Sequence, residues 1–192
     1  MAGAKSIVKA DTPSFSDHIF RRDKVALSEG QDFLEMAQRE KSALKQVALL
    51  EKSVMCLKRA FSKANELQDS DARDVARSAA KSMNSAYHML AESLKKLNAQ
   101  ERELFLAGEK EYRTIYGSSV AKPPVRPENP AVAFVASPLV PAVGIAPVSV
   151  SKETWEEYER DLALYNKKGK EFIAGLATEC EILAQLPALS PS

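Results

Sequence analysis

Apolar residues recur every three or four positions between Phe33 and Ala64, and this stripe constrains the fold more than any other feature of the chain. Only Glu40 interrupts it. A repeat of about 3.5 residues that persists over several heptads is typical of a long helix whose apolar seam is buried against other helices. The sequence therefore predicts a helical packing element. The members of the stripe are Phe33, Met36, Ala43, Val47, Leu50, Val54, Leu57, Phe61 and Ala64.

Signals for helix ends predict where this element begins and where a second one follows. Ser28 and Gln31 fit a Ser-x-x-Gln capping box, which places the start of the first helix at Ser28 and its end near Leu67. A polar break follows, in which Asp69 or Ser70 can cap the next helix. A connection this short predicts an antiparallel hairpin.

The second helix is predicted to run to Ile115 and to stop at Gly117, so that the hairpin covers residues 28–117. If the chain folds back near Asp69, small residues of the second helix face large residues of the first, which allows a close approach. The small residues are Ala72, Ala76, Ala79 and Ala86, and the large ones are Val54, Leu57 and Phe61.

Residues 118–151 have a different composition, with seven prolines and an uncharged run at 129–151. That density of proline excludes a helix. The apolar run at 131–150 is long enough for a membrane span, but its prolines would leave backbone groups without partners in lipid. We expect an extended apolar strap that lies on a surface, either on the hairpin of the same chain or in a groove of another subunit.

A third amphipathic helix is predicted over residues 152–186, and the Thr-x-x-Glu capping box at 154–157 marks its start. The first half of this helix is acidic. An N-terminal arm that can form a short helix occupies residues 1–27, and a short tail occupies residues 187–192. The apolar stripe of the third helix consists of Trp155, Tyr158, Leu162, Tyr165, Phe172, Leu176, Cys180 and Leu183.

Charge and cysteine usage limit the classes of function. The formal net charge is +1, far from the strongly basic balance of proteins that neutralise many phosphates, so no nucleic-acid partner is expected. Cys56 and Cys180 have no Cys-x-x-Cys partner, and we expect buried thiols in the cytoplasm or another reducing compartment. A disulfide between them is the alternative. The first residues lack the pattern of a secretory signal peptide.

No residue pattern indicates catalysis, a cofactor or a metal. His18 and His88 have no second ligand at helical spacing, and the chain contains no glycine-rich phosphate loop. The sequence thus predicts an all-α, non-enzymatic structural or assembly protein that binds itself or other protein subunits, within a larger complex such as a virion or a secretion apparatus. The alternatives are a peripheral membrane-binding module of the crescent type and a helical chaperone or adaptor. The residues predicted to bind a partner are Phe134, Val135, Leu139, Val140 and Ile145 on the strap, with Trp155 and Tyr158 at its exit.

Overall fold

The described part of the chain consists of α-helices and the segments between them, without a strand, in a computed structural model, which confirms the predicted all-α class. The structure describes residues 21–67, 69–120, 123–127 and 151–185. The described residues form two compact units: those within 21–105 with 172–185, and those within 106–171. The helices are α2 (Arg22–Arg39), α3 (Ala43–Leu67), α4 (Ser70–Lys96), α5 (Ala99–Gly108), α6 (Lys110–Val120) and α7 (Lys152–Gln185).

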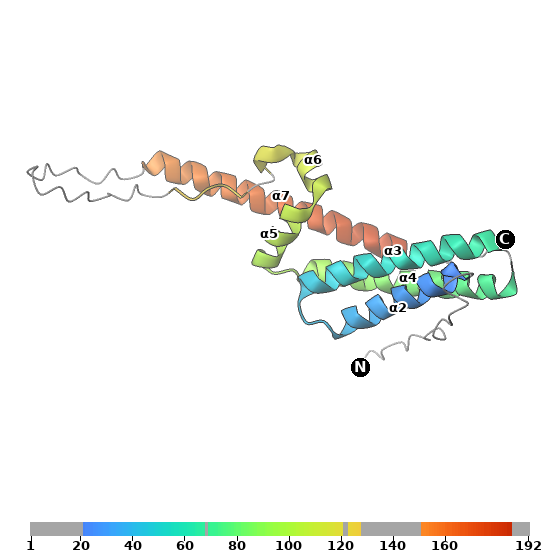
Figure 1. Ribbon diagram of the computed structural model, residues 1–192. Helices are drawn as coiled ribbons and strands as arrows, with labels where there is room; N and C mark the ends of the chain where they lie inside the picture. The colour runs from blue at the N-terminus through green and yellow to red at the C-terminus, as the bar shows by residue number, and fades with distance from the viewer. Residues whose placement is uncertain (1–20, 68, 121–122, 128–150, 186–192) are drawn as a thin grey trace, which may run out of the picture. The chain divides into compact units, whose positions relative to one another are not determined.

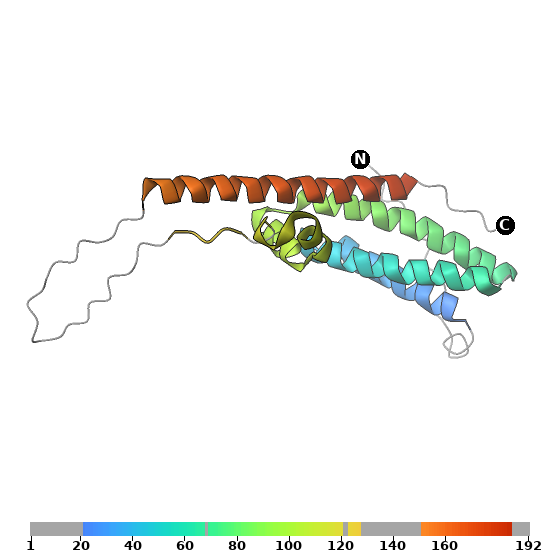
Figure 2. The same cartoon turned by 90° about the horizontal axis from the view of Figure 1, so that it is seen from above.

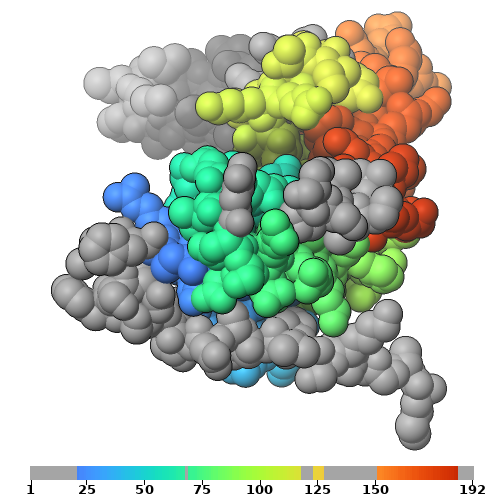
Figure 3. Space-filling view, turned by 90° about the vertical axis from the view of Figure 1, so that its right-hand side faces the viewer, coloured from blue at the N-terminus to red at the C-terminus, as the bar shows by residue number. Residues whose placement is uncertain are grey.

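Helices α2, α3 and α4 form an up-down-up bundle in the first unit and lie side by side in both ribbon views (Figures 1 and 2). The buried Ser53 hydroxyl of α3 donates a hydrogen bond to the Gly30 carbonyl of α2 at 2.6 Å. On the other side of α3, the Ser93 hydroxyl of α4 donates to the side-chain oxygen of Gln46 at 3.1 Å. Figure 3 looks onto the end of this bundle, where the turn between α3 and α4 lies beside the first turn of α2.

The first predicted helix is divided in two, which corrects the expectation of one helix from Ser28 to Leu67. The chain breaks at residues 40–42, at the position of the interrupting Glu40. The Glu40 carboxylate accepts hydrogen bonds from the backbone N–H groups of Lys41 and Ser42 at 2.9 and 3.0 Å. These bonds stabilise a turn, and α2 folds back along α3. The break also shifts the buried face of α2, so that Met36 is exposed and Leu34 and Ala37 are buried.

The predicted capping box at Ser28 is wrong, because α2 already begins at Arg22 and Ser28 lies inside it. Gln31, its expected second member, is buried and donates a hydrogen bond to the Ser82 hydroxyl of α4 at 3.3 Å. The Gln31 side chain thus joins α2 to α4 and does not cap a helix. A residue that can cap is ambiguous in sequence whenever apolar periodicity continues on both sides of it.

The predicted cap at Asp69 is confirmed. Its carboxylate accepts a hydrogen bond from the Ala72 backbone N–H at 2.6 Å, at the start of α4. The small residues expected to face α3 are all buried, with no more than 1% of their surface exposed: Ala72, Ala76, Ala79 and Ala86. The predicted burial of these small residues is thus confirmed, whereas their match with Val54, Leu57 and Phe61 stays a prediction.

The second predicted helix is also divided, into α4, α5 and α6. At the start of α5, the Asn98 side-chain oxygen accepts a hydrogen bond from the Glu101 N–H at 2.9 Å. The Glu101 carboxylate in turn accepts one from the Asn98 N–H at 3.2 Å. This reciprocal capping box stabilises a new helix start where the sequence predicted a continuous helix. The expected stop at Gly117 corresponds to a kink, with a φ angle of 75° at that residue.

Helix α7 agrees closely with the third predicted helix and is drawn as one continuous rod (Figures 1 and 2). Its cap differs from the prediction: the Ser151 hydroxyl, and not that of Thr154, accepts a backbone hydrogen bond, from the Thr154 N–H at 3.2 Å. Residues 172–185 belong to the first unit, where the Glu181 carboxylate of α7 pairs with Lys95 of α4. The strap residues 128–150 lie outside the described residues.

Candidate interaction site

Of the seven residues predicted to bind a partner, the structure describes two, Trp155 and Tyr158. They lie one turn apart near the start of α7, in the second unit. Their rings meet edge to face, with centroids 5.9 Å apart and planes at 87°. Both residues are half-buried. The other five, Phe134, Val135, Leu139, Val140 and Ile145, lie outside the described residues.

Arg126 is the residue at this site that the sequence analysis missed. Its guanidinium carbon lies 5.7 Å from the centroid of the Trp155 ring, a cation–π contact that brings the segment 123–127 to the start of α7. At an exposed position such a contact stabilises by about 0.5–1 kcal/mol. The signal in the sequence is the lone arginine between prolines, close to an otherwise apolar run. Beside it, Val125 is 91% exposed.

Acidic residues surround the two aromatic rings. The stretch from Lys152 to Asp161 carries five carboxylates against two cations, a net charge of −3. Within the described residues, only one of the five forms an ion pair, that of Glu156 with Lys152 at 3.4 Å. The carboxylates of the other four are left to solvent: Glu153, Glu157, Glu159 and Asp161.

The apolar stripe of α7 changes in burial along its length. Its first members, Trp155, Tyr158 and Leu162, are half-buried, whereas Tyr165 and Gly169 are buried. At Gly169 the fit is close, because an added Cβ atom would lie 2.5 Å from a methyl carbon of Leu106 in the same unit. Tyr112 also lines this position, and burial raises the pKa of its phenol. Phe172 and Cys180 are buried as well, whereas Leu176 and Leu183 are half-buried. Buried members of the stripe thus occur from Tyr165 onward, and the first three members are incompletely covered.

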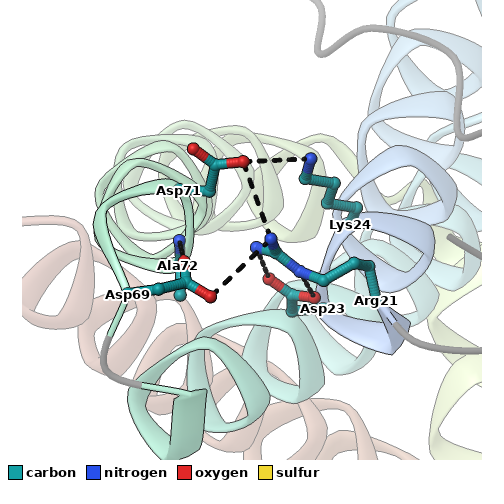
Figure 4. Close-up of polar contacts among 6 residues, drawn as sticks. All are labelled: Arg21, Asp23, Lys24, Asp69, Asp71 and Ala72. Carbon is teal, nitrogen blue, oxygen red and sulfur yellow. Dashed lines mark hydrogen bonds and ion pairs between the residues drawn. The ribbon is translucent and has the colours of Figure 1, made fainter.

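A polar network fastens one end of the three-helix bundle (Figure 4). Arg21 donates two hydrogen bonds to the fully buried carboxylate of Asp23, at 3.1 and 2.9 Å. Its guanidinium also lies 3.8 Å from Asp69 and 3.6 Å from Asp71, across the turn between α3 and α4, and Lys24 lies 3.5 Å from Asp71. Every charge in this network is opposed by another. The geometry of this network therefore indicates a structural role, in which ion pairs hold the start of α2 against the start of α4.

The pKa values in this network follow from its geometry. Burial opposes ionisation of Asp23, but the hydrogen bonds and charge of Arg21, with backbone N–H groups, outweigh burial and lower the pKa of that carboxyl. The same hydrogen bonding to Asp23 raises the pKa of Arg21. Both groups of the pair are therefore ionised at neutral pH.

The cysteines and the described histidine do not form a reactive site. Cys56 is half-buried and Cys180 is buried, both are free thiols, and burial raises the pKa of each. The Cys56 sulfur lies 3.9 Å from the carboxylate of Glu29, whose charge disfavours the thiolate further. His88 is exposed on α4. No group of three or more potential metal ligands is found among the residues that the structure describes.

The comparisons with known proteins provide no relative. No family model, no curated protein and no solved structure matches this chain. Within the described ranges, none of the helices has the length and apolar character needed to cross a membrane.

Proposed function

We propose that this protein is a non-enzymatic structural or assembly protein that makes protein–protein contacts through helical packing and through its apolar strap. The observation that carries the proposal is the incomplete burial of the first part of α7. Among the described residues, none from Lys152 to Leu164 is buried, although the same stripe further along α7 contains the buried residues Tyr165, Phe172 and Cys180.

Physical chemistry supports a partner at this surface. Trp155, Tyr158 and Leu162 each keep part of their apolar surface in contact with water, and Leu164 is 43% exposed. Removing apolar surface from water stabilises a complex by roughly 25 cal/mol per Å², and aromatic residues dominate the energy of many interfaces. Clustered exposed apolar groups commonly mark interaction sites.

The proposed partners are further copies of this chain or other subunits of a larger complex, such as a virion or a secretion apparatus. The alternative of a crescent-type membrane module needs free cations, yet three of the five lysines in the basic clusters at 95–96 and 167–170 form ion pairs. Lys95 pairs with Glu92 and Glu181, and both Lys167 and Lys168 lie within 4.0 Å of Glu171. A helical chaperone or adaptor would use the same exposed stripe for a client protein.

Light scattering after size exclusion tests self-association. We expect the wild type to be a defined oligomer and the triple variant Phe134→Ser, Leu139→Ser, Ile145→Ser to be folded but smaller. The double variant Trp155→Ser, Tyr158→Ser should keep the mass of the wild type, since like charges around these rings disfavour a second copy there. The control removes exposed apolar groups elsewhere, with Met55→Ser and Ile182→Ser, at sites that are 65% and 58% exposed. This control should keep the mass of the wild type. Equal, monomeric masses for all four proteins would make self-assembly wrong.

A further inference from the structure

The start of α7 carries both aromatic rings and carboxylates on one short surface. We define the acidic–aromatic face as Trp155, Tyr158, Glu159 and Asp161. The two rings contact each other, Glu159 lies one turn from Trp155 and Asp161 lies one turn from Tyr158, and both carboxylates are exposed without an ion pair among the described residues. Aromatic faces and carboxylates are the two groups that bind a guanidinium best, the first by cation–π attraction and the second by charge-assisted hydrogen bonds.

The chain itself already places one guanidinium on this face. Arg126 lies over Trp155 from a segment with the sequence Pro-Pro-Val-Arg-Pro, whose prolines favour an extended conformation. This contact uses a single cation. It leaves a stretch with a net charge of −3 largely unmatched, because Arg126 forms no ion pair with these carboxylates among the described contacts.

We propose that the acidic–aromatic face binds an extended, proline-containing segment of a partner protein that carries several arginines, and that Arg126 occupies part of the face when the partner is absent. This inference rests on the proposed function, since it names the chemistry of the partner for the exposed stripe. Affinity comes from aromatic stacking of one guanidinium and from pairing of the others with the free carboxylates. Arg126 is then an intramolecular competitor whose contact is weak enough to be displaced.

A second copy of α7 fits this face less well than a cationic segment. Glu159 lies one position after Tyr158, and Asp161 lies one position before Leu162, so the two carboxylates flank the apolar stripe on its two sides. Two identical helices that pair along this stripe in antiparallel orientation would bring like charges together, which disfavours the complex. A basic partner would neutralise the same charges.

Fluorescence can follow this face alone, because Trp155 is the only tryptophan of the chain. The full-length protein is titrated with a synthetic peptide that contains two tandem copies of the sequence of residues 123–127, and with the same peptide in which both arginines are glutamine. We expect saturable emission changes with the arginine peptide only, and weaker binding as ionic strength rises. The variant Arg126→Ala should bind the peptide about two- to fivefold more tightly, because its own guanidinium no longer competes.

A charge-matched pair of variants separates the face from net charge. Glu159→Gln, Asp161→Asn should weaken peptide binding by about tenfold. The control Glu103→Gln, Glu111→Gln removes the same charge from exposed acids elsewhere and should bind as the wild type does. The proposal is overturned if the two peptides act alike or if the two double variants bind equally.

The occupant is also tested by light scattering. If Arg126→Ala turns a wild-type oligomer into a monomer, the face holds the segment of a second copy, and the proposed foreign partner is wrong. An unchanged mass together with arginine-specific peptide binding supports the proposal. Fluorescence measures peptide binding and light scattering measures assembly, so the two results are independent. If the wild type is an oligomer but does not bind the peptide, the proposed function stands and only this inference is wrong.

Discussion

The three-helix bundle and the start of α7 use opposite kinds of side chain for their apolar surfaces. In the bundle, α4 presents small residues such as Ala72 and Ala79, which are fully buried, and Leu50 and Leu57 are fully buried on α3. At the start of α7 the stripe consists of large residues, Trp155 and Tyr158, that are only half-buried. In the bundle the small residues allow a close approach and the large leucines fill the core, so little apolar surface is left, whereas the half-buried rings of α7 keep apolar surface that a partner can cover. The contrast suggests that one region stabilises the fold and that the other is available for binding.

The largest expected difference is between leucines in the two regions. Leu57→Ala removes a fully buried side chain and should lower the free energy of unfolding by about 3 kcal/mol, through lost burial and a remaining cavity. Leu162→Ala in α7 should cost less than about 1 kcal/mol, since that side chain is only half-buried. Urea unfolding followed by circular dichroism measures both. Equal losses would remove the distinction between the two regions.

The ion-pair network around Arg21 and Asp23, at one end of the bundle, should make the free energy of unfolding depend on pH. Asp23→Asn keeps the shape of the side chain but removes its charge beside Arg21, and we expect a loss of about 2 kcal/mol at neutral pH. Because the pKa of Asp23 is lower in the folded protein than in the unfolded chain, its contribution is present above the unfolded value, near 4. That contribution is lost as the pH falls through the folded pKa.

Unfolding curves recorded from neutral to acidic pH check the direction of this pH dependence. The wild type should lose more stability than Asp23→Asn as the pH falls below about 4. Asp74→Asn is the control, because Asp74 forms an exposed ion pair with Arg77 in which both side chains are at least 71% exposed. Its pH dependence should match that of the wild type. Parallel curves for the wild type and Asp23→Asn would show that the buried pair contributes nothing.

Two glycines should respond to alanine with opposite signs. At Gly30 in α2 an added Cβ atom would lie 2.7 Å from the Leu57 side chain and 3.2 Å from its backbone nitrogen, so Gly30→Ala should destabilise by about 1 kcal/mol. At Gly175 in α7 nothing lies within 4 Å, so Gly175→Ala should stabilise by about 0.5–1 kcal/mol through helix propensity. Thermal unfolding distinguishes them. Stabilisation by both would mean that α2 and α3 can separate without cost.

The smallest effect is expected at Arg126. Arg126→Ala should change the free energy of unfolding by less than about 0.5 kcal/mol, since the side chain is exposed and its only described contact is with the Trp155 ring. The emission of Trp155 should nevertheless shift, because the guanidinium leaves its ring. Paired measurements of unfolding and fluorescence test this. A large loss of stability would make the contact part of the fold and not a replaceable occupant.

The sequence by itself determined the helical class, the Asp69 cap, the buried alanines of α4 and the extent of α7. Each of these depends on local or periodic information: a side chain that reaches a backbone group three residues away, or a repeat that matches one helix face. The reciprocal cap of Asn98 and Glu101 was also readable, but continuous apolar periodicity concealed it.

Only the tertiary structure decided where the long stripe breaks. The turn at Glu40 is stabilised partly from far along the chain, because the Ser42 hydroxyl donates a hydrogen bond to Glu101 at 2.9 Å, and the Gln46 side chain that donates to the Glu40 carbonyl also binds Ser93. Likewise, Asp23 could be buried as an ion only because Arg21 lies beside it and the α3–α4 turn lies across from it. The contacts of Ser42 with Glu101, of Gln46 with Ser93 and of Arg21 with Asp69 join residues about 50 positions apart. Their energy appears only once the helices have packed, so the interruption at Glu40 alone could not predict the turn.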